Sequence, residues 1–463
     1  MILQHVYKPI LNFIYSKITY RISDRAREII LFITFFLMFY LLFAAKYLHV
    51  MSGDARDMSI MLLMGVAILF SLDREQKILK WNLVFYIPFA LMGVYMLMIA
   101  LFFHSIGDSY TIFILFILFA CMCLAFVWGN RGDYNRMFMI VSAAYMLFYA
   151  ILLVWCLAKY GIYFGEGYSM WFNTNGFAKL TCPAVACGIH LFICVEKTAW
   201  RVIFAALAGA AGCMIFFTTC KTAQIAVIMM AAACFFLLII KGGKVLKRFI
   251  CFLLVFMLAF GACFGFLHYV TPVISGDPVE SHVVVFKTSS SNPNPVDENS
   301  PYKIYEREMI EKVQSNPTLA KLDKIGTGRI HLWAMYLNRI NMTGNVKTLR
   351  RVGAHNQYVE FTYKAGLPVG AAWLFILVAM FIMIVIGLVK RKGDWIYFVM
   401  LNYPTFFWFS LLETGVFPME RGFILIYYLS LLPLLIRQAQ AKDTIEKTIE
   451  ETTEENKSMV EEM

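Results

Sequence analysis

The chain has 463 residues, of which 60% are apolar and only 15% are charged. This composition excludes an ordinary soluble globular protein and is typical of a membrane protein. A net charge of +11 would suggest a nucleic-acid partner in a soluble protein. In a membrane protein it indicates basic residues collected on the cytoplasmic side, so we expect no nucleic-acid partner.

The first element is a short amphipathic segment within residues 1–28. Its apolar residues recur at helical spacing, with Lys8 and Lys17 between them. This pattern predicts a helix that lies in the cytoplasmic interface of the membrane. The apolar positions are Ile2, Leu3, Val6, Ile10, Phe13 and Ile14.

Twelve apolar segments follow, and segments of this kind can cross a hydrocarbon core of about 30 Å. We therefore predict an all-α polytopic membrane protein with about twelve transmembrane helices, nine in 29–268 and three in 367–436. The predicted spans are 29–48, 58–72 (which is short), 83–103, 110–128, 137–158, 176–194, 200–219, 222–240, 249–268, 367–389, 395–412 and 422–436.

Lysine and arginine divide the connecting segments into two alternating sets. The positive-inside rule makes the basic set cytoplasmic, which predicts that both termini lie in the cytoplasm and that residues 269–366 lie on the outer face. The basic set holds Lys8, Lys17, Arg21, Arg25, Arg27, Arg74, Lys77, Lys80, Arg131, Arg136, Lys197, Arg201, Lys241, Lys244, Lys247, Arg248, Lys390, Arg391 and Lys392, and the other short loops hold Lys46, Arg56, Lys159, Lys221 and Arg421.

The large outer loop, 269–366, begins with an irregular stretch rich in Ser, Asn and Pro. After it, YKIYEREMIEKV, GRIHLWAMYLNRI and HNQYVEFTYKA predict three short amphipathic helices. The last helix is expected to end at Gly366, with His355, Val359 and Thr362 on one face. Residues 437–463 form a charged cytoplasmic tail.

Polar residues are expected to converge on the outer surface at three places. Lys221 lies in TTCKTA, a tight turn between two spans, and Asn173 and Asn175 lie in WFNTNGFA, where a span begins; Arg329 and His355 lie in the outer loop. Each type also has an ordinary structural explanation. A lysine at a span end can snorkel to the interface, an asparagine before a helix is usually an N-cap, and a lone histidine is more often an ordinary interfacial residue.

Four segments resemble motifs of the O-antigen ligase and polymerase superfamily of bacterial membrane glycosyltransferases. GAHNQYVEFTYKAGLPVG is similar to the His-Asn motif that closes the family's large periplasmic loop, and GTGRIHLW to its Gly-Arg…Trp element. TTCKTA stands where the family usually has Ser-Arg, and WFNTNGFA resembles its Asn-Pro-Asn-x-x-Ala segment. The family's Pro-x-x-Gly-x-Gly element is replaced by NMTGNVKTLRRVGA.

The resemblance implies transfer of a glycan from an undecaprenyl-pyrophosphate carrier to an acceptor hydroxyl, on the outer face of the bacterial inner (cytoplasmic) membrane. Lys221 and Arg329 would neutralise the pyrophosphate leaving group, and His355 would accept the proton of the attacking hydroxyl. With these cations and no Asp-x-Asp pair, neither a metal nor another cofactor is expected.

The resemblance also implies substrate contacts from Asn173, Asn175 and Asn356. Arg350 and Arg351 are either phosphate contacts or plain surface charge. The acceptor is open: a lipid core, a growing glycan, as in a repeat-unit polymerase, or a protein serine. A function of another class is a polysaccharide flippase or transporter, but such proteins usually show internal repeats and charged or broken helices near the midplane, and no repeat is evident here.

Overall fold

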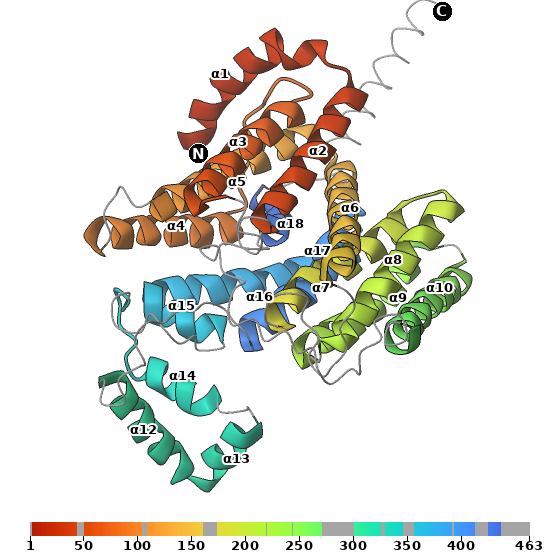
Figure 1. Cartoon of the computed structure of the whole chain (residues 1–463). Helices are drawn as coiled ribbons and strands as arrows, with labels where there is room; N and C mark the ends of the chain where they lie inside the picture. The colour runs from red at the N-terminus through yellow and green to blue at the C-terminus, as the bar shows by residue number, and fades with distance from the viewer. Residues whose placement is uncertain are drawn as a thin grey trace, which may run out of the picture.

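The computed structural model describes residues 2–43, 51–103, 109–160, 174–218, 220–242, 244–270, 301–325, 329–345, 356–390, 393–412 and 425–436. Within these ranges the protein is all-α, with a single isolated antiparallel bridge and no strand. A bilayer offers no water to backbone polar groups, and a helix satisfies them within one segment. The predicted all-α class is confirmed for this part of the chain (Figure 1).

The helices follow one another with short connections. They are α1 (Ile2–Lys17), the 3-10 turn η1 (Thr19–Arg21), α2 (Asp24–Phe43), α3 (Gly53–Ser71), α4 (Leu83–Phe103), α5 (Ser109–Arg131), α6 (Tyr134–Tyr160), α7 (Thr174–Cys194), α8 (Thr198–Phe217), α9 (Lys221–Lys241), α10 (Val245–Gly265) with the π-turn η3 (Phe266–Val270), α12 (Pro301–Gln314), α13 (Pro317–Ile325), α14 (Arg329–Leu337), α15 (Gln357–Ala365), α16 (Leu367–Val389), α17 (Trp395–Leu412) and α18 (Leu425–Leu435).

All twelve predicted spans fall on helices in the parts that the structure describes. Of the described residues, eight helices are long and apolar enough to cross a membrane: α2, α6, α7, α8, α9, α10 with η3, α16 and α17. The protein is thus a helical protein of the multi-pass membrane type. The other four predicted spans, α3, α4, α5 and α18, are helical but are not among these eight.

The helix that contains the predicted span 58–72 begins before that span. Arg56 was expected in a short loop before a span at 58–72, but α3 already begins at Gly53, because Ser52 caps it by accepting the amide of Ala55 at 3.2 Å. Arg56 is buried inside the helix and donates to Asp57 at 2.7 Å from Nε and 2.5 Å from Nη2. This ion pair lets a charged helical turn be buried.

Helix α8 approaches its neighbours closely through small residues. A Cβ added at Gly209 would lie 2.3 Å from the backbone oxygen of Phe256 on α10, and one added at Gly188 of α7 would lie 2.9 Å from Cβ of Ala208. Helices in lipid gain little from the hydrophobic effect between them, so small residues that let backbones approach provide the packing energy. Together α7, α8 and α10 form a tightly packed group (Figure 1).

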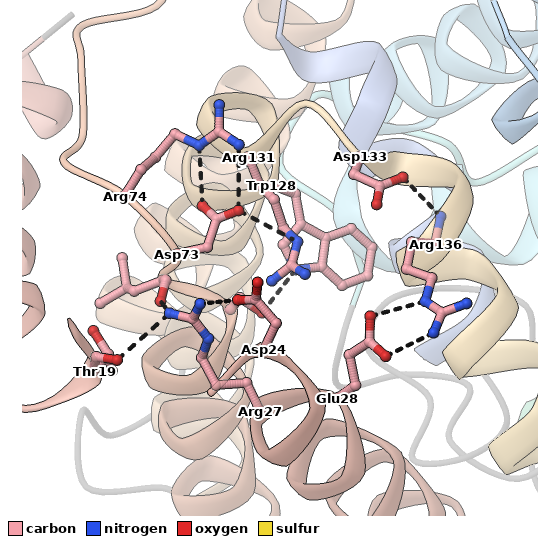
Figure 2. A network of polar contacts seen from close by, with 12 residues as sticks. Thr19, Asp24, Arg27, Glu28, Asp73, Arg74, Trp128, Arg131, Asp133 and Arg136 are labelled. Atoms are coloured by element: carbon pink, nitrogen blue, oxygen red, sulfur yellow. Dashed lines mark hydrogen bonds and ion pairs between the residues drawn. The ribbon is translucent and has the colours of Figure 1, made fainter. Parts of the chain in front are cut away.

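A polar network occupies one face of the bundle, where η1, α2 and the connector after α3 meet (Figure 2). Arg27 is buried, pairs with Asp24, and donates to the backbone oxygens of Leu72 at 2.8 Å and Thr19 at 3.5 Å. One guanidinium therefore joins the start of α2 to the end of α3.

The same network reaches α5 and α6 (Figure 2). Asp73 pairs with Arg74 at 3.3 Å and with Arg131, at the end of α5, at 3.7 Å. Arg136 on α6 donates two hydrogen bonds to the carboxylate of Glu28, at 2.8 and 2.7 Å. The basic loops at the starts of α2 and α6 and at the ends of α3 and α5 thus share a face.

The remaining basic loops are joined in a similar way. Lys241, at the end of α9, donates to the backbone oxygen of Ile193, near the end of α7, at 2.9 Å and to Asp394, before α17, at 3.0 Å. The ring of Tyr134, at the start of α6, lies 6.2 Å from that of Trp395. The connections that are rich in Lys and Arg therefore lie together on one face of the structure.

The connector 72–82 is extended, and side-chain amides hold it. Three amides each accept from the backbone N–H and donate to the backbone oxygen of one connector residue. The pairs are Gln4 with Leu79, Asn12 with Gln76, and Asn130 with Lys77, at N···O distances between 2.7 and 3.4 Å. These bonds give the connector's backbone the hydrogen-bond partners that a neighbouring strand would give it in a sheet.

The two ends of the described chain lie on this face. The amide of Asn82 donates to the backbone oxygen of Leu435 at 2.9 Å, and Trp81 forms the isolated bridge with Ile436. Because Gln4 of α1 holds the same connector, α1 and the end of α18 lie on the same face of the bundle.

The helices α12, α13 and α14 of the predicted outer loop, here called the outer layer, lie at the opposite end of the molecule from α1 (Figure 1). The three helices predicted in this loop, α12, α14 and α15, build a small apolar core together. The core contains Met309, Met335, Tyr336, Val359 and Tyr363. The intervening α13, Pro317–Ile325, was not predicted; it starts at a proline behind the capping Asn316, a recognised helix-start signal. Helix α15 ends at Gly366 as predicted, at a φ of 95°.

The close approach of α8 and α10 gives a stability test. Gly209→Ala should destabilise the protein by about 1–3 kcal/mol, as overpacking in tight cores does, because the new methyl group meets a backbone oxygen. Gly261→Ala on α10 is the matched control, since nothing lies within 4 Å of its Cβ. It should be neutral or stabilising by up to about 1 kcal/mol. Thermal unfolding midpoints in one detergent measure both, and equal midpoints would contradict the packing.

Candidate functional site

The structure describes four of the eight predicted site residues. Lys221 is the first residue of α9 and is exposed, Arg329 is the first residue of α14 and is half-buried, Asn175 lies in the first turn of α7, and Asn356 directly precedes α15. The other four, His355, Asn173, Arg350 and Arg351, lie outside the described residues.

Asn356 is buried and fixes α15 to the bundle. Its Oδ1 accepts the backbone amide of Val359 at 3.0 Å, which makes it the N-cap of α15. Its Nδ2 donates to the backbone oxygen of Leu411, in the last turn of α17, also at 3.0 Å. Helix α15 thus begins one residue after Asn356, and the predicted place of His355 on this helix lies outside the described residues. Asn356 itself has a structural role, whatever it does for a substrate.

The other end of α15 is held just as closely. Gly366 ends the helix, and its amide donates to the backbone oxygen of Thr362 at 2.9 Å. A Cβ added at Gly370, in the first turn of α16, would lie 1.9 Å from Oγ1 of Thr362. Only glycine therefore allows α15 to fold back onto α16. Thr362 faces α16 and Val359 faces the small outer core, so these two predicted neighbours point toward different partners.

Lys179, on α7, is a cation that the sequence analysis overlooked. It is half-buried, and its Nζ lies 5.9 Å from the ring centroid of Phe409, in the last turns of α17. It follows Asn175 by four residues, so the two lie on one side of α7. A signal existed in the sequence: an ionisable residue inside an apolar span is costly and is a functional-site hypothesis by default.

Lys221 lies at the same end of the bundle as Lys179. The Sγ of Cys182, three residues after Lys179, lies 4.0 Å from the backbone oxygen of Ala223, in the first turn of α9. Helix α9 packs against both α7 and α17. The structure therefore brings Lys221, Lys179, Asn175 and Asn356 to one end of a three-helix group.

Arg329 belongs to the outer layer. It begins α14, whose first amides, from Ile330 and His331, donate to Oδ1 of Asp323 at 2.8 and 3.2 Å. A carboxylate from α13 thus occupies the positive end of the α14 dipole. Helix α14 meets the rest of the molecule mainly through α15, where the rings of Tyr336 and Tyr363 lie 4.9 Å apart. Arg329 and Lys221 consequently lie in different layers.

Two further polar side chains of α15 are buried or half-buried. Glu360 is 4% exposed and lies one turn after Asn356. Burial raises the pKa of the Tyr358 phenol, so its hydroxyl stays protonated at neutral pH. Both residues are in the HNQYVEF stretch, but neither was chosen from the sequence.

No group of three or more His, Cys, Asp or Glu side chains that could hold a metal ion occurs among the described residues. Comparison with protein-family models finds no match, and comparison with curated proteins finds none either. The case for a function therefore depends on the residues themselves and their arrangement.

The double role of Asn356 can be tested. Asn356→Ala removes an N-cap worth about 1 kcal/mol and a buried hydrogen bond worth about as much again, so amide hydrogen exchange throughout α15 should become faster. Asn316→Ala is the matched control, since Asn316 caps α13 through Thr318 and Leu319 but is exposed. That variant should affect α13 and leave α15 protected. Unchanged exchange of α15 in Asn356→Ala would refute the anchoring role.

Proposed function

We propose that this protein is a membrane glycosyltransferase of the O-antigen ligase type, which moves a glycan from an undecaprenyl-pyrophosphate carrier to an acceptor hydroxyl. The observation that carries the proposal is the gathering of polar groups at one end of α7, α9 and α17. Lys179 lies over Phe409, Asn356 binds Leu411, and Lys221 begins the adjoining helix. A polyprenyl tail lies in lipid with its pyrophosphate at the headgroup level, which is where these groups would meet it.

In the proposed reaction, the acceptor oxygen attacks the anomeric carbon and the bond from that carbon to the pyrophosphate oxygen breaks. His355 accepts the acceptor's proton; its reference pKa near 6.5 suits this role. In this proposal Lys221 approaches the leaving pyrophosphate from the bundle and Arg329 approaches it from the outer layer, and together they neutralise the charge that develops on it. Lys179, on α7, adds a third cation, which is half-buried whereas Lys221 is exposed. A charge-stabilised departure of this kind needs no metal ion.

The remaining predicted residues have binding roles in this proposal. Asn173 and Asn175 contact the donor from the start of α7, and Asn356 holds α15 so that His355 stays near the acceptor. Arg350 and Arg351 add phosphate contacts from the segment before α15. A glycan, a lipid or a protein hydroxyl can each serve as acceptor, and a repeat-unit polymerase uses the same chemistry.

The proposal places the site on the outer side of a bacterial cytoplasmic membrane. Its support is that the basic connections share one structural face while Lys179 and Asn356 lie toward the outer-loop helices. The positive-inside rule assigns the basic face to the cytoplasm.

Sidedness can be measured directly by labelling single cysteines in a variant whose native cysteines have been replaced. In intact cells, a membrane-impermeant maleimide should label Ser290→Cys. It should label Val245→Cys and Arg391→Cys only after the membrane has been permeabilised. The opposite pattern would place the proposed site in the cytoplasm and eliminate this function.

Transfer assays with purified protein, defined donor and defined acceptor test the roles. His355→Ala should lose roughly 10²–10⁴-fold in transfer rate, as expected for lost acid–base catalysis, with donor binding nearly intact. Lys221→Ala should weaken donor binding as well as rate, and Lys221→Arg should be tolerated. Lys179→Met keeps an unbranched apolar stem beside Phe409 but removes the charge, so it should also weaken donor binding.

His5→Ala is the matched control for the base, because His5 is exposed on α1, at the other end of the molecule. It should transfer at the wild-type rate. Full activity of His355→Ala would remove this histidine from the mechanism, and unchanged donor binding in both Lys179→Met and Lys221→Ala would remove the phosphate contacts.

A further inference from the structure

Helix α1 presents an uncovered apolar face. Val6, Ile10 and Phe13 are 51%, 54% and 64% exposed, and their spacing places them on one side of the helix. Gln4 and Leu11 lie on the other side and are buried. Three large apolar side chains are thus exposed in a row at the surface.

The orientation of α1 is fixed, so this face cannot turn inward. Gln4 makes two hydrogen bonds with the backbone of Leu79, at 2.8 and 2.9 Å, and Asn12 makes two with the backbone of Gln76, at 2.7 and 3.4 Å. These clamps lie eight residues apart, close to both ends of the helix. Whatever covers Val6, Ile10 and Phe13 must therefore come from outside the described part of the chain.

Exposed cations follow the apolar face. Lys17, Arg21 and Arg25 are all exposed. The two nearest acids are occupied, because Asp24 pairs with Arg27 and Glu28 with Arg136 (Figure 2). Within the part of the chain that the structure describes, no carboxylate pairs with any of the three cations. They form a positively charged patch next to an apolar one.

The position of the apolar face and the cations next to a membrane span indicates which kind of partner binds them. The candidate span α2 begins at Asp24, three residues after Arg21, so residues 17–25 lie where a bilayer's headgroups would be. An amphipathic helix at that depth buries its apolar side chains at the boundary between headgroups and acyl chains and places its cations beside lipid phosphates. A protein partner would have to compete with lipid that is already there.

We propose that α1 and the cations Lys17, Arg21 and Arg25 form a binding site for anionic phospholipids. Val6, Ile10 and Phe13 enter the acyl boundary, and the three cations bind the phosphate groups. The site is on the face opposite Lys179 and Asn356, so it is independent of the transfer reaction proposed above.

The test uses the full-length protein in detergent, titrated with phosphatidylglycerol or phosphatidylcholine and followed by native mass spectrometry. Phosphatidylglycerol should bind more tightly to the wild type. The triple variant Lys17→Gln/Arg21→Gln/Arg25→Gln should lose at least about tenfold of this affinity, since each cation near an anionic leaflet contributes roughly fivefold. About 0.5 M salt should weaken wild-type binding as well, because it screens exposed charges.

The matched control changes Lys244, Lys247 and Arg248 to Gln at the start of α10. These residues lie in another basic connection, and Lys244 and Lys247 are exposed. This variant should keep its affinity for phosphatidylglycerol within about twofold. Equal loss in the two variants would show diffuse charge attraction and overturn the site, and so would equal wild-type affinity for the two lipids. Salt-insensitive binding to the wild type would also overturn it, even if the α1 variant failed to fold.

Discussion

The need to satisfy every backbone polar group without water governs this structure. Helices meet it within each span, and in one non-helical connection on the basic face side-chain amides bind the backbone groups. Residues 72–82 leave the helical state at the face where four helices meet, and side-chain amides from Gln4, Asn12 and Asn130 bind their backbone groups pair by pair. The connector stays extended because these amides replace the partner strand that it lacks.

The same requirement explains why polar side chains concentrate at helix ends. Arg27 binds the free carbonyl of Leu72 after α3, and Lys241 binds the carbonyl of Ile193 near the end of α7. Asn356 does the equivalent for Leu411 at the end of α17. Cations suit the carboxyl ends of helices because the helix dipole is negative there. The basic residues from which the orientation in the membrane was predicted thus also bind backbone carbonyls at the ends of helices.

The sequence predicted that the long apolar segments are helical, and it predicted α12, α14 and α15, because apolar runs and amphipathic spacing are local patterns. It also predicted the end of α15 at Gly366, where a positive φ favours glycine. What it could not give depends on residues far apart. Nothing local shows that Gly370 must accommodate Thr362, or that Gly209 must accommodate the backbone of Phe256.

For the candidate site the limits were similar. The sequence placed Lys221 correctly at the start of a span, but it gave Asn356 no capping role. Lys179 was taken as part of an apolar run, since only the fold shows its proximity to Phe409. Arg56 was assigned to a short loop, whereas the structure buries it in the first turn of α3, paired with Asp57. The positions of His355, Asn173, Arg350 and Arg351 lie outside the described residues.

Helix α15 contributes side chains to two separate cores. Val359 and Tyr363 pack with Met309, Met335 and Tyr336 of the outer layer, whereas Tyr358 packs with the main bundle. Its backbone also holds the segment after α14, since the oxygen of Tyr363 accepts the amide of Asn345 at 2.9 Å. The outer layer is consequently not a detachable module. If related chains exchange this region by recombination, crossovers that keep α12–α14 together with their own α15 preserve both cores, whereas a crossover between α14 and α15 mismatches one of them.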